Sequence, residues 1–246
     1  MTDLLYQTDS YLRTFEANVI RADENQHAIL LDRTAFYPGG GGQPYDLGSL
    51  HWGQQSALLL RAKNLGGDIW HFLDAEQPLP PPEVTVRGEL DWERRYQTMR
   101  THTAMHILCG VIFRDYGAQV TGGDMEPLQG RMDFEFENMT AELVNVIEEA
   151  INREVEAARE IRIAILPREE AFKIPDLIRT KINLLPPGIQ RIRTIEIVGL
   201  DLQADGGTHV HNTREVGKLH ISDYKSKGRI NKRIYLQLEK NASQPE

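Results

Sequence analysis

The sequence predicts an α+β protein, with a small β-barrel in residues 1–90 followed by a two-layer domain in residues 91–246, where helices pack on a mixed sheet. Two observations lead to this prediction. The first part contains short apolar runs separated by glycine and proline, a pattern typical of small barrels. The second part alternates amphipathic helical stretches with short strands, which is typical of α+β domains.

Composition and charge limit the classes of protein to which the chain can belong. Of its 246 residues, 40% are hydrophobic and 26% are charged, which fits a soluble globular protein of one or two domains. A single cysteine excludes an intramolecular disulfide framework and suits a reducing compartment. We find neither an apolar run of membrane-spanning length nor a secretory signal, so a cytoplasmic protein is expected.

The formal net charge of −8 argues against a largely nucleic-acid-binding surface. The basic residues are unevenly distributed, however, because residues 218–240 carry seven basic and two acidic residues. Such a segment can bind phosphate, or it can be a solvated hairpin.

In the first domain we expect short strands at residues 15–21, 27–32, 57–63, 68–73 and 83–90. Between the second and third lies a run of four glycines, 39–42, followed by Gln43 and Pro44. Consecutive glycines permit positive φ angles and allow backbone N–H groups to face a polar ligand. The run lacks the Lys-Ser/Thr of a phosphate-binding loop, and a wide turn between strands is the alternative.

The second domain is expected to open with a helix over residues 92–116, capped by Asp91 and stopped by Gly117. A second helix begins after Thr140, and a short one follows Pro167. Residues 122–124 are expected to form a turn. Strands are expected at residues 131–136, 160–166, 191–198, 216–224 and 229–238.

Two short stretches together suggest a metal site. His102 and His106 lie four residues apart in the first predicted helix, and therefore on one face of it. About a hundred residues later, Asp205 and His209 lie in a glycine-containing turn. Three imidazoles and a carboxylate form a ligand set that suits zinc. The alternative is that a chance histidine pair and an ordinary strand-to-turn connection coincide. Because Thr103 follows His102 where a zincin protease has glutamate, that class is disfavoured.

Two further residues near these stretches could have been ligands. Cys109 shares the helix face of the two histidines but is one turn too far along to reach the same metal, so we interpret it as a small buried residue. His211, two residues beyond His209, is a candidate spare ligand.

Four motifs, in order, resemble those of a known family. The stretch 100–108 is similar to the helix motif of the alanyl-tRNA synthetase editing domain, and 205–210 to its Cys-Gly-Gly-Thr-His motif. The segments 212–217 and 227–234 also fit, and 36–48 resembles the Gly-rich motif of the barrel that precedes the editing domain. Since the chain has no room for an aminoacylation core, it is identified as a free-standing editing protein of the AlaX family, in the form with an N-terminal Gly-rich domain.

The resemblance implies hydrolysis in trans of the ester that joins a wrong amino acid, chiefly serine and secondly glycine, to alanine tRNA. It implies zinc as the cofactor, with His102, His106 and His209 as ligands. The family's usual cysteine is Asp205 here, which either binds the metal directly or contacts a metal-bound water. We expect substrate contacts from Thr103, Gly40, Gly41 and Gln43, and no acid or base is singled out.

The partner implied is mischarged alanine tRNA, which the basic segment 218–240 and the arginines Arg94, Arg95 and Arg100 could contact. Either a monomer or a homodimer is compatible with the sequence. One alternative is an editing-like module that binds tRNA but has lost catalysis through Asp205. Another is a hydrolase of a small ester or amide on the same fold.

Overall fold

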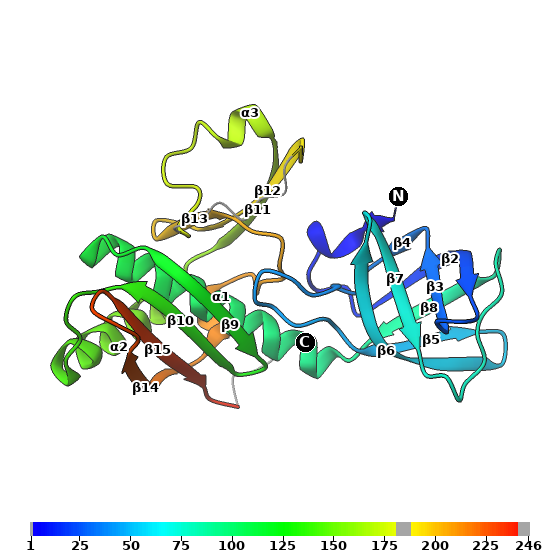
Figure 1. The fold of residues 1–246 in the computed structure, drawn as a ribbon, viewed down its shortest axis with the longest axis horizontal. Helices are drawn as coiled ribbons and strands as arrows, with labels where there is room; N and C mark the ends of the chain where they lie inside the picture. Colours follow the sequence, from blue (N-terminus) through cyan, green and yellow to red (C-terminus); the bar gives the residue numbers. More distant parts are fainter. Residues whose placement is uncertain (1, 181–187, 241–246) are drawn as a thin grey trace. The chain divides into compact units, whose positions relative to one another are not determined.

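The computed structural model describes residues 2–180 and 188–240 (Figure 1). The chain forms two compact units, Met1–Tyr96 and Gln97–Glu246. Among the described residues, no helix combines the length and the apolar character needed to cross a membrane.

The first unit is a closed barrel of antiparallel strands. In barrel order the strands are β2 (Thr14–Asp23), β3 (Ala28–Leu31), β7 (Asp68–Leu73), β6 (Gln55–Leu65), β5 (Gly48–Trp52) and β8 (Thr85–Leu90). Buried and exposed residues alternate along β2 and β8, so one face of each strand fills the barrel interior. The short β1 (Asp3–Leu4), η1 (Leu5–Gln7) and β4 (Arg33–Thr34) complete this unit.

Strand β5 was not expected, because Gly48 and Gly53 look like turn residues in the sequence. Gly48 instead permits a close strand approach, since a Cβ atom there would lie 2.2 Å from the Glu89 carbonyl oxygen on β8 and 2.7 Å from the Phe36 ring. The barrel therefore closes at a glycine that no other residue could replace without moving β8.

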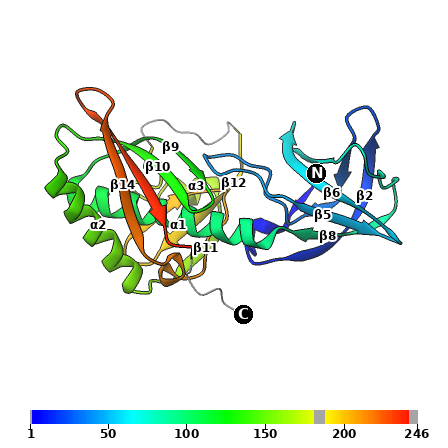
Figure 2. The same cartoon turned by 90° about the horizontal axis from the view of Figure 1, so that it is seen from below.

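The second unit contains two layers, helices and a four-stranded antiparallel sheet (Figure 2). The sheet order is β14 (Leu219–Ser226), β15 (Asn231–Leu238), β10 (Gln129–Glu135) and β9 (Val120–Glu126). It packs on α1 (Trp92–Tyr116), whose first turn belongs to the first unit, and on α2 (Ala141–Glu156). Asp91 caps α1, Thr140 caps α2, and Gly117 follows α1 with a φ of 65°, as predicted.

The turn expected at residues 122–124 is wrong, because these residues lie within β9. A Cβ atom on Gly123 would lie 3.2 Å from the Met105 side chain of α1, and one on Gly130 of β10 would lie 3.0 Å from its sulfur. These glycines thus let the sheet pack closely on α1, and they do not reverse the chain.

A second sheet joins β11 (Ile161–Pro167), β12 (Arg191–Ile197) and β13 (Asp201–Ala204), all antiparallel. The helix α3 (Arg168–Ala171) packs on it, and η2 (Thr213–Val216) follows the 205–209 turn. The predicted fold class, a barrel followed by an α+β domain, is confirmed. In detail, the strands of the second unit form two antiparallel sheets in place of the single mixed sheet expected.

Candidate metal centre

Helix α1 presents two of the predicted ligands. His102 and His106 lie on one of its faces, with ring centres 5.1 Å apart. Both are nearly buried, with side-chain exposures of 6% and 9%. A helix holds such a pair at fixed spacing, which is the geometry a chelating pair needs.

The turn after β13 contains the other two predicted ligands, Asp205 and His209. Asp205 Oδ1 accepts the Gly207 N–H at 2.7 Å, which closes the turn with a side-chain bond. The buried guanidinium of Arg193 donates to the carbonyl oxygens of Asp205, at 3.1 Å, and Gly207, at 2.8 Å. The turn is therefore held from both sides, and it directs Asp205 and His209 toward α1.

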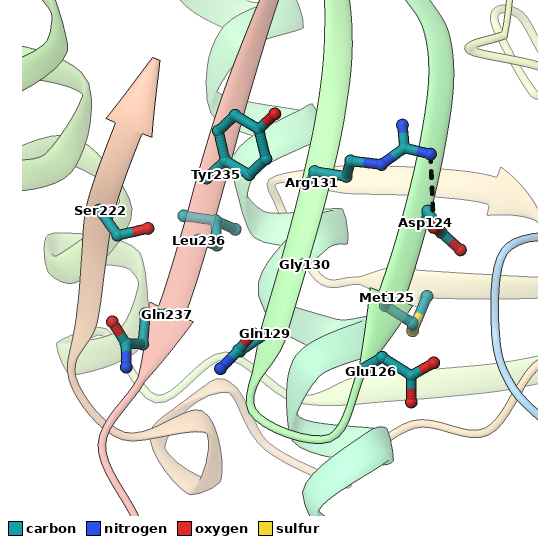
Figure 3. A pocket seen from close by; sticks show the side chains of 10 residues that line it. All are labelled: Asp124, Met125, Glu126, Gln129, Gly130, Arg131, Ser222, Tyr235, Leu236 and Gln237. Carbon is teal, nitrogen blue, oxygen red and sulfur yellow. Dashed lines mark hydrogen bonds and ion pairs between the residues drawn. The ribbon is translucent and has the colours of Figure 1, made fainter.

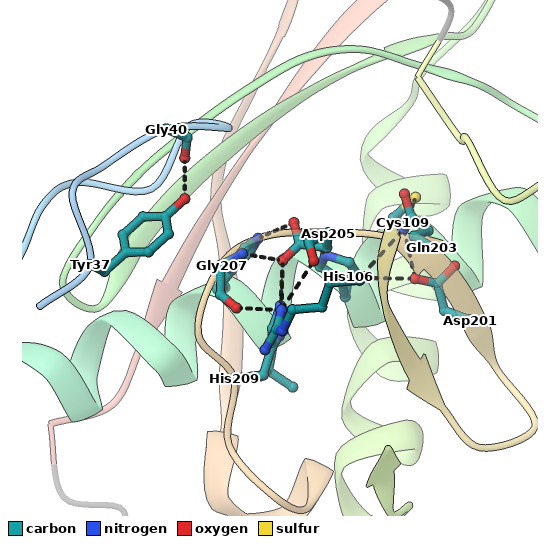
Figure 4. Close-up of polar contacts among 12 residues, drawn as sticks. Tyr37, Gly40, His106, Cys109, Asp201, Gln203, Asp205, Gly207 and His209 are labelled. Carbon is teal, nitrogen blue, oxygen red and sulfur yellow. Dashed lines mark hydrogen bonds and ion pairs between the residues drawn. The ribbon is translucent and has the colours of Figure 1, made fainter. Parts of the chain in front are cut away.

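The four side chains converge (Figure 4). One potential ligand atom from each of His102, His106, Asp205 and His209 lies within 4.8 Å of all the others. Asp205 Oδ2 is 3.4 Å from His102 Nε2 and 3.9 Å from His106 Nε2, while Oδ1 is 3.1 Å from His209 Nε2. The structure thus brings together the four residues that the sequence predicted as metal ligands.

In this buried cluster, each ionisable group shifts the pKa values of its neighbours. Burial acts to raise the pKa of Asp205, but the charge of His102 and hydrogen bonds from the three histidines outweigh it, so this pKa lies well below its usual range. Burial lowers the pKa of His209 well below its usual range, and the nearby His102 charge adds to the effect. For His106, burial is outweighed by hydrogen bonds to Asp201 and Asp205, which raise its pKa to about 9. An ionised carboxylate surrounded by imidazoles is a set of donors suited to a divalent cation.

Two residues behind the cluster contact the outer nitrogens of the histidine rings. Asp201, fully buried, lies with Oδ2 3.1 Å from His106 Nδ1. The Thr103 hydroxyl lies 3.1 Å from His209 Nδ1 and also accepts the Val210 N–H at 3.3 Å. The structure therefore places Thr103, predicted as a substrate contact, as a fully buried residue against the His209 ring.

The Gly-rich loop belongs to the first unit. Gly40 and Gln43 exchange backbone hydrogen bonds of 3.0 and 2.9 Å, and the Tyr37 hydroxyl donates to the Gly40 carbonyl at 3.0 Å (Figure 4). The φ angles of Gly39–Gly42 are all positive, from 60° to 139°, so the run of glycines is required by the backbone. Gln43 is 3% exposed, whereas a Cβ atom on Gly41 would meet nothing within 4 Å. Substrate contacts from this loop stay a prediction.

Two of the arginines predicted to meet RNA are buried, and that prediction is wrong for them. Arg95 is fully buried and binds the Asp46 carboxylate and the carbonyl oxygens of Ser10, at 2.9 Å, and Ala35, at 2.5 Å. Arg100, 1% exposed, donates to the carbonyl oxygens of Val216 and Glu239. Both guanidinium groups bind main-chain carbonyls inside their units, so neither is available to a phosphate. The partly buried Arg94 lies 3.4 Å from the Tyr45 carbonyl oxygen.

Two further residues near the cluster, Cys109 and His211, were considered as ligands in the sequence analysis. Cys109 is buried as expected, its thiol contacts Gln203 at 3.4 Å, and burial raises its pKa. His211 is exposed and is not part of the cluster. Sequence reasoning missed Asp201, whose only signal was an acidic residue at the start of a strand, four residues before Asp205.

A shallow hollow of about 280 Å³ lies over the outer face of the four-stranded sheet (Figure 3). Polar side chains line it, among them Gln129, Tyr235 and Gln237, and its Arg131 pairs with Asp124 at 3.3 Å. None of the four clustered residues lines it, and its one basic side chain, Arg131, pairs with Asp124. The buried cluster is therefore the stronger candidate for chemistry.

The fold and the cluster define a class of two-unit proteins that have a barrel and a histidine–carboxylate centre. Comparison with known proteins identifies the family within this class. Residues 9–94 match the tRNA synthetases of class II (A), and residues 188–235 match the threonyl and alanyl tRNA synthetase second additional domain. The alanyl-tRNA editing protein AlaX-M of Saccharolobus solfataricus is 41% identical over 96% of this chain and 98% of its own. The protein of that name from Methanosarcina mazei is 35% identical over 99% of both chains.

The alanine–tRNA ligase of Ignicoccus hospitalis is 38% identical over 89% of this chain, which spans only 24% of the ligase. The similarity to AlaX-M proteins, in contrast, runs nearly from end to end. The chain belongs to the AlaX-M family of alanyl-tRNA editing proteins.

Proposed function

We propose that this protein hydrolyses, in trans, the ester that joins a wrong amino acid to alanine tRNA, in a zinc-dependent reaction. Serine is the chief amino acid proposed, and glycine is the second. The observation that carries the proposal is the convergence of His102, His106, Asp205 and His209 within 4.8 Å. The names of the relatives that match almost the whole chain support the substrate class.

The donor set fits zinc. Three imidazole nitrogens and one carboxylate oxygen are ligands that zinc accepts, and catalytic zinc sites are typically nitrogen- and oxygen-rich. The lowered pKa of Asp205 keeps its carboxylate ionised and able to bind a cation, which supports Asp205 as the fourth ligand. When bound, zinc would supply positive charge that polarises a carbonyl group or lowers the pKa of a water molecule.

The protein's own residues have three tasks in this proposal. His102, His106 and His209, whose Nε2 atoms face Asp205, would hold the metal, and their burial limits access of bulk water. The Arg193 guanidinium keeps Asp205 and His209 in place by holding the turn. An aminoacyl ester is already activated, so positioning it contributes a large share of the rate.

For discrimination of serine from alanine, we propose that the 91–246 domain carries hydrolysis and that the Gly-rich loop contacts the amino acid. A site that hydrogen-bonds the serine hydroxyl leaves a polar group without a partner when alanine is bound. Gly40 and Gln43 bond each other through their backbones, and Gln43 is 3% exposed, so we propose the Gly41 backbone as the part of the loop that makes such a bond. The open space around Gly41 supports this role.

For the tRNA, the exposed end of the β14–β15 hairpin is the proposed phosphate contact. Lys227 and Arg229 are exposed there. In contrast, Lys225 pairs with Asp223 at 2.9 Å, and Lys232 is buried with its ammonium donating to the Gly228 and Arg229 carbonyl oxygens. The proposed RNA contact is therefore narrower than the basic segment of the sequence suggested.

The test is a deacylation assay with serine-, glycine- and alanine-charged alanine tRNA. The purified protein is assayed as prepared, after treatment with a chelator, and after zinc is restored, with zinc content measured each time. We expect serine to be released and alanine to be spared, with release lost on chelation and in His106→Ala. His211→Ala is the matched control, since His211 lies two residues from a ligand yet outside the cluster.

Absence of release from every charged tRNA, in protein shown to contain zinc, would contradict the proposal. If that protein still bound the tRNA, it would be a binding module. Turnover of small esters with charged tRNA left intact would point instead to an unrelated hydrolase on the same fold.

A further inference from the structure

We infer that Asp201 is a positioning residue of the proposed centre, which holds the His106 ring so that Nε2, and not Nδ1, faces the other three ligands. The inference rests on the proposed function, because it concerns the same metal centre. It assigns a role to a buried carboxylate that is not itself part of the cluster.

The contact between the two side chains fixes the position of a proton. Asp201 Oδ2 lies 3.1 Å from His106 Nδ1, and a carboxylate oxygen can only accept. Nδ1 must therefore carry the hydrogen, and the lone pair available for a metal is on Nε2. That nitrogen is the one that lies 3.9 Å from Asp205 Oδ2.

Gln203 supports this arrangement. Its Nε2 donates to the same Asp201 oxygen at 2.6 Å, and it lies 3.5 Å from His106 Nδ1. An amide N–H cannot donate to a ring nitrogen that already carries a proton, so the productive bond of Gln203 is the one to Asp201. The carboxylate is thus fixed by a donor on each side of Oδ2.

The surroundings of the second carboxylate oxygen, Asp201 Oδ1, explain how a negative charge is tolerated in this buried position. Asp201 is fully buried, and Oδ1 has no hydrogen-bond partner within the described part of the chain. Arg179 Nε lies 3.6 Å away, and the guanidinium stacks 3.6 Å from the ring centre of Phe113 on α1. An isolated buried carboxylate is costly, and Arg179 offsets this charge. Among the described residues, the hydrogen bonds of the Asp201 side chain go to His106 and Gln203, as a positioning role requires.

The fold provides space for this contact. Asp201 is the first residue of β13, and it approaches α1 at Gly110, one turn after His106. A Cβ atom on Gly110 would lie 3.1 Å from Asp201 Cβ and 2.9 Å from Leu200 Cγ. A glycine on the ligand-bearing face of α1 is what lets the carboxylate reach His106.

The experiment measures zinc affinity and the His106 proton in the full-length chain. Affinity is obtained by competition with a chromophoric chelator for wild type, Asp201→Ala, Asp201→Asn and the control Asp223→Ala, whose carboxylate is exposed on the same unit. Long-range ¹H–¹⁵N spectra of the zinc-loaded proteins report the Nδ1 protons of the three histidines. Urea unfolding of the metal-free proteins measures any loss of stability separately.

We expect Asp201→Ala to bind zinc about 10- to 100-fold more weakly, as for other contacts that orient a ligand. Asp201→Asn should be intermediate, because it keeps an oxygen acceptor, and Asp223→Ala should match wild type. The His106 Nδ1 proton should exchange rapidly with water in Asp201→Ala, while the His102 and His209 signals stay unchanged. A purely structural role would change unfolding without this selective effect.

Wild-type affinity in folded Asp201→Ala overturns the inference and leaves the proposed function intact. Failure of the wild-type protein to bind zinc overturns both. If Asp201→Ala does not fold, Asp201→Asn carries the test, and wild-type affinity in that variant overturns the inference.

Discussion

Gly110→Ala tests whether the close approach of α1 to β13 matters for the centre. In an isolated helix this substitution is favourable by about 1 kcal/mol, because alanine has the higher helix propensity. In this protein the added Cβ atom would lie 2.9 Å from Leu200 Cγ and 3.1 Å from Asp201 Cβ, closer than carbon atoms normally pack. Helix propensity and steric overlap change the free energy of unfolding in opposite directions, so the sign of the measured change shows which effect is larger.

The overlap should dominate. Overpacking of this kind costs about 1–3 kcal/mol, which leaves a net destabilisation of about 0–2 kcal/mol after the gain in helix propensity. To relieve it, β13 must retreat by a few tenths of an ångström from α1. The hydrogen bond from His106 Nδ1 to Asp201 Oδ2, now 3.1 Å, would then approach the outer limit of about 3.5 Å for such bonds. We therefore expect a zinc affinity about 10-fold weaker, the lower end of the range for such losses.

The assay pairs urea unfolding with chelator competition, and Gly206→Ala is the matched control. Gly206 lies in the 205–209 turn, where a Cβ atom would meet nothing within 4 Å. It should be neutral, or up to about 1 kcal/mol more stable through loss of unfolded-state freedom. A Gly110→Ala protein that is about 1 kcal/mol more stable than wild type, with unchanged zinc affinity, would refute the reasoning.

Three further predictions concern other parts of the chain. Arg95→Met should lower the free energy of unfolding by about 3–5 kcal/mol, measured by urea titration, because it leaves the Asp46 carboxylate buried without its partner. Burial lowers the pKa of His71 to about 4, so below pH 6.5 the unfolded chain binds the extra proton first. Stability should therefore fall by about 3 kcal/mol between pH 6.5 and pH 4, and His71→Leu should remove this part of the slope. Lys227→Ala with Arg229→Ala should weaken tRNA binding and reduce the slope of log affinity against log salt by about 2.

Each of these predictions has a control and an outcome that counts against it. Arg87→Met, on the exposed barrel surface, should change stability by less than about 0.5 kcal/mol, and an equal effect at both arginines would contradict the buried-pair argument. An identical pH slope in wild type and His71→Leu would show that burial of that imidazole does not control it. Unaltered salt dependence in the hairpin variant would place the RNA contact elsewhere.

Local signals in the sequence were sufficient for the helices and for the ligand pairs. The caps Asp91 and Thr140 and the stop Gly117 act within one or two turns, and the four-residue spacing of His102 and His106 needs only a helix. These features depend on neighbours in sequence, so they survive without knowledge of the tertiary fold.

Features that depend on distant neighbours were not predictable. Gly48 and Gly123 look like turn residues, but each permits close packing against a residue far away, Glu89 or Met105. Asp201 is 95 residues from His106, and no spacing rule connects them. Arg95 was assigned to RNA because arginine is common there, whereas its burial follows from carbonyl groups that only the folded barrel supplies.

Residues 205–210 resemble a motif that begins with cysteine, and the presence of aspartate at that position can be understood from the two oxygens of Asp205. Oδ1 accepts the Gly207 N–H at 2.7 Å and closes the turn, while Oδ2 faces His102 and His106 at 3.4 and 3.9 Å. A cysteine has one sulfur atom, which would have to accept the Gly207 N–H and face His102 and His106 at the same time. The carboxylate therefore shapes the turn and faces the centre at once, and the charge it brings is balanced by the neighbouring histidines. In the proposed enzyme, Asp205 is therefore compatible with a metal centre, and the deacylation assay decides between that enzyme and a module that has lost catalysis.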